Sequence, residues 1–194
     1  MKTISNLVLY FLLLLFLHAC SPTNILATGS GSAMVIAEGE RSMGSVIDDA
    51  TIKVNIAAKF ISSEDNLFVD VSTTVLDGRV LLTGLVDNQE IRIDAVRRVW
   101  EVEGVQEVIN EIQIGNRATL KEYANDLWIN TQAKGLAAKA VGLRVVGYNF
   151  ETIQGKVYIA GITSKPSQLE DLIEAVKTIK GVKEIVNYVI IKEN

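Results

Sequence analysis

The stretch DGRVLLTG at residues 77–84 decides the fold, because it returns 77 residues later as QGKVYIAG at 154–161. In both copies the second residue is a glycine, which supplies the positive φ of a tight hairpin turn, and an apolar run follows as a strand. The flanking segments 48–114 and 125–191 align without a gap. Matching glycines at one fixed spacing indicate a duplicated unit, and so long a period predicts two small domains.

Each copy predicts the same order of elements: helix, strand, strand, helix and strand. Asp48 and Asp126 are the expected N-caps of the first helices, and Gly104 and Gly181 the expected C-caps of the second. The predicted ranges are helices at 48–60, 88–102, 126–140 and 166–179, and strands at 67–75, 79–86, 108–114, 144–152, 156–162 and 185–191. The expected fold class is α+β, with two tandem αββαβ domains, each a three-stranded sheet with two helices on one face.

The N-terminal segment has the layout of an export signal. Its apolar part, even taken from Ile4 to Ala19, is 16 residues long, whereas a membrane-spanning helix needs roughly 20. It follows Lys2 and ends at Cys20, so residues 1–19 are predicted to be a cleaved signal peptide. The ending Leu-x-Ala-Cys resembles the bacterial lipobox, which makes Cys20 the expected lipid anchor. The alternative is a plain signal peptide with a stray cysteine.

Composition excludes several kinds of chemistry. Cys20 is the sole cysteine, and the sole histidine, His18, would leave with the signal peptide. Catalytic triads, Cys–His pairs and imidazole–metal sites are therefore excluded from the mature chain. The sequence contains no P-loop, GxGxxG or GxSxG motif. Composition does not exclude a catalytic site with two carboxylates, but nothing in the sequence singles out such a pair. We expect no enzyme activity, no cofactor and no metal.

The hairpin stretch and the later Gly104-Val105 and Gly181-Val182 resemble the BON domain, over about residues 41–192. BON domains are non-enzymatic modules at bacterial membranes and in periplasmic stress proteins. Two-domain lipoprotein members bind anionic phospholipid through the first helix of the second domain, support envelope integrity and gather at division sites. The resemblance thus implies an outer-membrane, periplasm-facing lipoprotein, with an anionic phospholipid membrane and envelope or division proteins as partners. Ser21 after the cysteine agrees with outer-membrane sorting.

The resemblance and the repeat together define the expected domains. A flexible tether at 20–47 precedes domain 1 at 48–114, and a linker at 115–124 precedes domain 2 at 125–192. A domain this small buries only about 60% of its unfolded surface. We therefore expect the two copies to dock on each other.

The two copies differ in charge and in aromatic content. Residues 48–114 hold 13 acidic and 6 basic side chains, a net charge of −7, whereas 125–191 hold 6 acidic and 8 basic, a net charge of +2. An anionic membrane would repel the first copy and not the second. The charge difference has two alternative explanations: ordinary divergence of the surface, or attraction between the two copies. The chain is acidic overall, with a formal net charge of −4, which argues against nucleic-acid binding.

The first helix of the second copy carries the candidate site. Trp128 stands where the first copy has Thr51, and it lies about 100° around the helix from the core stripe. The predicted lipid-binding residues are Trp128, Lys134, Leu136, Lys139 and Val141. The alternative places Trp128 in a groove between the copies. The aromatics expected in the sheet or the domain interface are Tyr148, Phe150, Tyr158 and Tyr188.

Function is therefore predicted as anionic-phospholipid binding by a tethered module. The alternative is a periplasmic protein-interaction adaptor or an osmotic or envelope-stress protective factor. A hydrolase that uses two carboxylates is the least favoured hypothesis.

Overall fold

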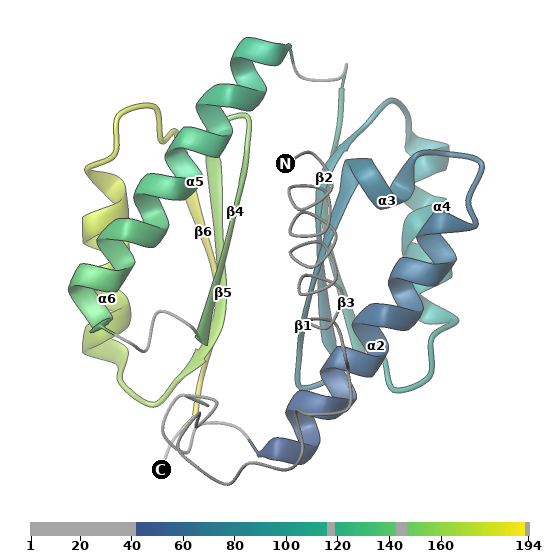
Figure 1. Cartoon of the computed structure of the whole chain (residues 1–194), viewed down its shortest axis with the longest axis horizontal. Helices are drawn as coiled ribbons and strands as arrows, with labels where there is room; N and C mark the ends of the chain where they lie inside the picture. Colours follow the sequence, from purple (N-terminus) through teal and green to yellow (C-terminus); the bar gives the residue numbers. More distant parts are fainter. Residues whose placement is uncertain (1–41, 116–118, 143–146, 193–194) are drawn as a thin grey trace, which may run out of the picture. The chain divides into compact units, whose positions relative to one another are not determined.

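The computed structural model describes residues 42–115, 119–142 and 147–192 (Figure 1). The chain divides into two units, Met1–Met34 and Val35–Asn194, and both repeats lie in the second unit. The expected signal peptide, Cys20 and residues 21–41 of the expected tether lie outside the described residues. The prediction of a flexible tether up to residue 47 was wrong at its end, because residues 43–47 belong to a helix.

Each repeat forms a three-stranded mixed sheet with helices (Figure 1). The first repeat consists of α2 (Met43–Ile61), α3 (Leu67–Asp70), β1 (Val71–Leu76), β2 (Arg79–Val86), α4 (Gln89–Trp100) and β3 (Glu107–Ile114). The second consists of α5 (Leu120–Val141), β4 (Tyr148–Ile153), β5 (Lys156–Thr163), α6 (Pro166–Lys177) and β6 (Glu184–Ile191). The strand orders are β1-β2-β3 and β4-β5-β6, antiparallel in the hairpin and parallel after the crossover. The α+β fold of two αββαβ units is confirmed.

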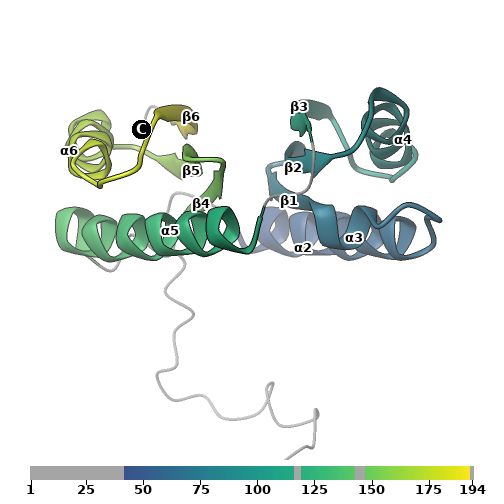
Figure 2. The ribbon, with the colours of Figure 1, turned by 90° about the horizontal axis from the view of Figure 1, so that it is seen from above.

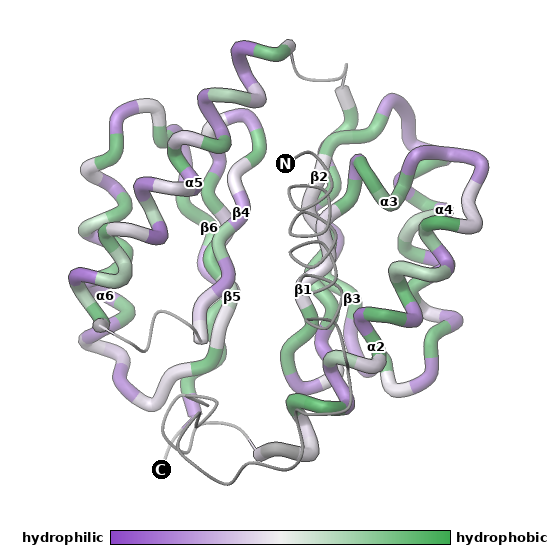
Figure 3. Tube along the Cα trace, viewed as in Figure 1, coloured by the Kyte–Doolittle hydropathy of each residue, from purple (hydrophilic) through white to green (hydrophobic). Residues whose placement is uncertain are grey.

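The central strands are buried on both faces. In β2, Val80 and Leu82 face the helices and belong to the core of the first repeat, whereas Leu81 belongs to a separate cluster on the other face of the sheet. This double burial explains why the quoted stretches are continuously apolar and do not alternate. Figure 2 shows the long helices of each repeat on one side of its own sheet. Along these helices, apolar and polar residues alternate (Figure 3), as half-buried helices require.

The first helices begin earlier than predicted. Ser42 is the N-cap of α2 and Thr119 is the N-cap of α5, so the prediction of Asp48 and Asp126 as N-caps was wrong. The first turn of α5 occupies part of the segment expected to be a linker. The sequence signal for these starts is a hydroxyl residue whose side chain accepts a backbone N–H three residues later.

Three further elements differ from the prediction. Residues Leu67–Asp70 form the short helix α3, where the β-rich composition predicted the start of a strand. The helices α4 and α6 end at Trp100 and Lys177, and Glu101 and Thr178 are their caps. Gly104 and Gly181 adopt a positive φ three residues further on, in the turn that leads into the last strand.

Aspartates on the first helices hold the hairpin turns. Asp49 accepts hydrogen bonds from the backbone N–H groups of Asp77 at 2.8 Å and Gly78 at 2.9 Å. Asp126 does the same for Gln154 at 2.6 Å and Gly155 at 2.9 Å. Each carboxylate satisfies two turn donors and fixes its helix to its hairpin.

The two repeats dock on each other, as expected from their size. The cluster between them joins Leu76 and Leu81 of the first repeat to Ala160 and Ile162 of the second, with Ile109, Tyr188 and Ile190 packed against it. Polar contacts surround the cluster. Gln113 donates to the Tyr158 hydroxyl at 3.1 Å, and Lys192 pairs with Asp77 at 2.6 Å.

Candidate functional site

Helix α5 carries the candidate site, and side-chain hydrogen bonds cap its N-terminus. The Thr119 hydroxyl accepts the backbone N–H of Glu122 at 3.3 Å, and the Glu122 carboxylate accepts the backbone N–H of Thr119 at 2.8 Å. These hydrogen bonds form a capping box. The hydrogen bond from the Thr119 backbone is the main reason that the pKa of Glu122 lies below its usual value.

The inward face of α5 is apolar and fully covered. Ile129, Ala133, Ala137 and Val141 are all buried at four-residue spacing in the core of the second repeat. The prediction that Val141 contacts lipid was therefore wrong, since its side chain is only 6% exposed and continues the buried stripe. Leu136 is half-buried and packs against the same core.

The outward face of α5 presents Trp128. Its side chain is 46% exposed, and it is not part of the cluster between the repeats. This contradicts the alternative of a tryptophan packed between the copies. Lys139 is exposed eleven residues later, which brings it within about 20° of Trp128 around the helix. Lys121, also exposed and seven residues before Trp128, lies on the same stripe.

Lys134 lies on a different flank of the helix. It is exposed, but six residues from Trp128 turn the helix to a position about 120° away. Its charge acts on Glu151, whose pKa is raised chiefly by desolvation and is lowered in part by Lys134. Trp128 and Lys139 thus lie on one stripe of α5, about 16 Å apart along the helix axis, and Lys134 lies on another flank.

Sequence reasoning missed four surface residues at the start of α5. Leu120 is 85% exposed, and Tyr123, Leu127 and Lys121 are exposed as well. Leu120, Lys121 and Tyr123 were assigned to the linker because the predicted helix began at residue 126, and Leu127 lay within that helix but was given no surface role. The spacing Thr119-x-x-Glu122 was the signal that could have located the true start.

The four aromatic residues that were expected in the sheet or the domain interface lie there, as predicted. Tyr148 and Phe150 lie in its core. Tyr158 is 1% exposed, and Tyr188 packs in the cluster between the repeats. The Tyr188 hydroxyl donates to the Glu111 carboxylate. Burial and this carboxylate together raise the pKa of Tyr188 well above its usual value.

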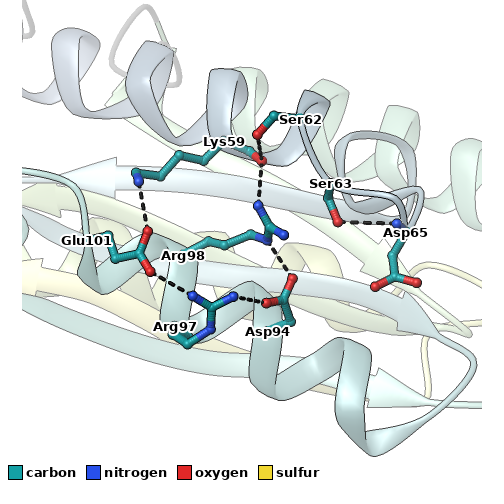
Figure 4. A network of polar contacts seen from close by, with 8 residues as sticks. All are labelled: Lys59, Ser62, Ser63, Asp65, Asp94, Arg97, Arg98 and Glu101. Atoms are coloured by element: carbon teal, nitrogen blue, oxygen red, sulfur yellow. Dashed lines mark hydrogen bonds and ion pairs between the residues drawn. The ribbon is translucent and has the colours of Figure 1, made fainter.

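The basic residues of the first repeat are largely engaged in local ion pairs. Figure 4 shows one network, in which Lys59 and Arg97 both contact Glu101, at 2.8 and 2.7 Å, and Arg97 and Arg98 both contact Asp94. Arg79 pairs with Glu107 at 2.6 Å. Within the part of the chain that the structure describes, Lys121, Lys134 and Lys139 form no ion pair. In the first repeat Lys53 is also exposed and outside these ion pairs, so accessible positive charge is present on both first helices and is more abundant on α5.

Two further kinds of feature are absent from the described residues. None of the helices in 42–115, 119–142 and 147–192 is long and apolar enough to cross a membrane. Within the same ranges, no three His, Cys, Asp or Glu side chains are grouped so as to hold a metal ion.

Comparison with known proteins identifies the family to which this chain belongs. The chain is 37% identical over 149 residues to an uncharacterized protein in the gshII 5' region of Anaplasma centrale, covering 76% of this chain and 97% of that protein. It is 28% identical over 179 residues to the outer membrane lipoprotein DolP of Haemophilus influenzae, covering 89% and 88%. It is 25% identical over 173 residues to the osmotically-inducible protein Y of Escherichia coli, covering 87% and 85%. The model of the BON domain matches residues 48–116 and 125–193, one match in each repeat, so the chain belongs to the BON-domain family.

Proposed function

We propose that this protein is an outer-membrane lipoprotein that faces the periplasm and binds anionic phospholipid through α5. It performs no chemistry, and it supports envelope integrity by holding a folded module at the membrane surface. The observation that carries the proposal is the exposed stripe of Lys121, Trp128 and Lys139 on α5.

The chemistry of the stripe suits a lipid headgroup layer. Tryptophan has an apolar body and a polar N–H, and it is enriched where membranes meet water. A lysine near an anionic surface contributes about 1 kcal/mol, and this fades within a Debye length. Gly135 lies between Trp128 and Lys139, and a Cβ added there would meet no atom within 4 Å, so that part of the helix surface is open.

The relatives support the location. One of them is an outer membrane lipoprotein, and the match covers 89% of this chain. The anchor proposed at Cys20 rests on the lipobox-like ending of the apolar segment. Anchoring through acyl chains would keep α5 at a high local concentration near the membrane, so a weak helix–lipid contact would be sufficient.

A second candidate function has its own observation. Leu120, Tyr123 and Leu127 form an exposed apolar surface on α5, and such surfaces also serve protein partners. In that case the protein would act as a periplasmic adaptor or stress factor, in line with its similarity to an osmotically-inducible protein. Binding would then be indifferent to lipid charge.

The test is vesicle co-sedimentation of the chain from position 20 onward with Cys20→Ser, so that no acyl anchor contributes. We expect binding to phosphatidylglycerol vesicles that weakens with salt, and little binding to phosphatidylcholine vesicles. Trp128→Glu should abolish it. Two matched controls should bind as wild type: Thr51→Glu at the equivalent position of the first repeat, and Trp100→Glu at the other exposed tryptophan.

Circular dichroism of each variant checks that the fold is retained. Equal binding to neutral and anionic vesicles, or a Trp128→Glu variant that binds like wild type, would reject lipid recognition by α5. The adaptor function would then account better for the exposed surface of the helix.

A further inference from the structure

Each sheet ends in a strand that is paired on one side only. β3 and β6 are the last strands in the orders β1-β2-β3 and β4-β5-β6, and among the described residues no strand pairs with their outer sides. Both have eight residues, whereas the opposite edge strands β1 and β4 have six. An open edge presents unpaired backbone N–H and C=O groups, so it can take up a strand from another chain.

The usual protection of such an edge is missing from both strands. Proteins commonly place lysine or proline on an edge strand, or cover the edge with another segment. Neither EVINEIQI at 107–114 nor EIVNYVII at 184–191 contains lysine, arginine or proline. Figure 2 shows β3 on the side of its repeat away from α2, and β6 on the side away from α5. These two edges therefore depend on some other feature to stay unpaired.

An asparagine occupies the middle of each edge. The side-chain oxygen Oδ1 of Asn110 accepts a hydrogen bond from the backbone N–H of Ile112 at 3.1 Å, and that of Asn187 accepts one from the N–H of Val189 at 2.9 Å. The two asparagines are equivalent positions, 77 residues apart. Both are exposed. The same contact thus recurs at the same place in both sheets.

The N–H groups that the asparagines bind point away from the sheet. Along a strand, successive backbone N–H groups alternate between its two sides. Gly115 donates its N–H to β2 at 2.9 Å, so the N–H of Ile112, three positions earlier, points to the outer side. Lys192 donates its N–H to β5 at 2.9 Å, and Val189 stands three positions before it. Each asparagine therefore occupies a donor that an added strand would need.

We propose that Asn110 and Asn187 keep the outer edges of the two sheets closed to strand addition by a second copy of this chain. A second copy is the partner that fits, because it presents the same edge, and like edges pair about a two-fold axis. β6 is the more vulnerable edge, since it has no charged side chain after Glu184, whereas β3 carries Glu111. Strand addition needs no lipid, so the proposal is independent of the proposed function.

The test measures molar mass by size-exclusion chromatography with light scattering over a range of concentrations. The chain from position 20 onward with Cys20→Ser should be a monomer. Asn187→Val in that chain should form a dimer, since its one opened edge is used up when two copies pair. Adding Asn110→Val opens the second edge, so each copy can pair twice and longer assemblies should form.

Two matched variants serve as controls, with circular dichroism to check the fold. Asn187→Asp keeps an acceptor oxygen and should stay monomeric. Asn149→Val should also stay monomeric, because Asn149 is exposed on the edge strand β4 but accepts no backbone N–H from the described residues. Equal association of Asn149→Val and Asn187→Val would overturn the proposal. A double variant that remains monomeric, or a wild type that associates as strongly as Asn187→Val, would do the same.

Hydrogen exchange examines the contact itself. At concentrations too low for association, the Val189 amide should exchange about two- to tenfold faster in Asn187→Val than in wild type, since one hydrogen bond is lost. Unchanged exchange at Val189 would show that Asn187 does not shield this donor, and the proposal would fail.

Discussion

The two repeats have the same fold and differ in sequence at the surface where they meet. Glu111 and Tyr188 occupy equivalent positions 77 residues apart, and their side chains hydrogen-bond to each other. Leu81 and Tyr158 are equivalent as well, and both contribute to the contact between the repeats. Equivalent positions meet in this way in a two-fold dimer, where one patch pairs with itself. Divergence within one chain has made the patch complementary, with a carboxylate on one side and a phenol on the other.

The first helices differ in what they expose. Outward-facing Ile47, Val54 and Ile61 recur every seven residues on α2, and this stripe contains no lysine. On α5, Trp128 lies between Lys121 and Lys139, and the equivalent positions of the first repeat hold Thr51, Gly44 and Ser62. The inward faces are nevertheless alike, since both supply buried residues to a core of the same design. A duplicated fold can therefore keep its packing while one copy acquires a separate surface chemistry.

The largest difference in stability loss between the copies is expected when the equivalent glycines of the two central strands, Gly84 and Gly161, are replaced by alanine. Gly84 has a φ of +150°, and a Cβ there would lie 2.1 Å from the Asp70 carbonyl oxygen. At Gly161 the nearest atom would be the Gly147 carbonyl oxygen at 2.8 Å. Gly84→Ala should lower the free energy of unfolding by about 3 kcal/mol and Gly161→Ala by about 1 kcal/mol, as measured by urea titration. The reverse order would mean that the second repeat is the more tightly constrained.

A smaller difference is expected for the aspartates that hold the hairpins. Asp49 is buried, whereas Asp126 is half-buried, so the unpaired turn donors would be less hydrated in the first repeat. Asp49→Ala should cost about 2 kcal/mol and Asp126→Ala about 1 kcal/mol. Faster hydrogen exchange at the Gly78 and Gly155 amides would locate each effect. Asp49→Asn keeps one acceptor oxygen and should cost less; a loss equal to that of Asp49→Ala would contradict a role for these hydrogen bonds.

The smallest effect concerns pH and the carboxyl group of Glu151. Desolvation raises its folded-state pKa above the ordinary value of 4.5. A raised folded-state pKa favours the folded state below that ordinary value, and the benefit is lost as the pH rises through the folded-state pKa. Glu151→Gln should therefore be more stable than wild type at pH 8, with a difference that shrinks toward pH 4 in thermal unfolding.

The other shifted carboxylates serve as an internal control for that experiment. The pKa values of Glu101 and Glu107 are lowered, mainly by hydrogen bonds from Lys59 and Arg79, so their contribution is lost at low pH. They are present in both proteins and cancel in the comparison. A difference that stays constant between pH 4 and pH 8 would show that Glu151 is ionised equally easily in the folded and unfolded states.

The sequence by itself determined the duplication, the hairpins and the order of helices and strands along the chain. These features depend on local rules: glycine at positive φ in the turns, apolar spacing of four along helices, and an unbroken apolar run in a strand buried on both faces. Spacing placed Trp128 about 100° around the helix from the core stripe. It left open whether the side chain is exposed or packed between the copies, and the structure leaves it 46% exposed. The start of α5 was predictable too, because Thr119 and Glu122 have the spacing of a capping box.

Only the tertiary structure decided which side chains are covered and which are brought together. Val141 became part of the core because α5 continues its buried stripe to the last turn. Asp49 holds a hairpin 28 residues away, a contact that no local pattern contains. A cavity lined by Val69 and Leu127 joins segments from both repeats. Such features depend on long-range packing of the whole chain, and one-dimensional periodicity does not encode them.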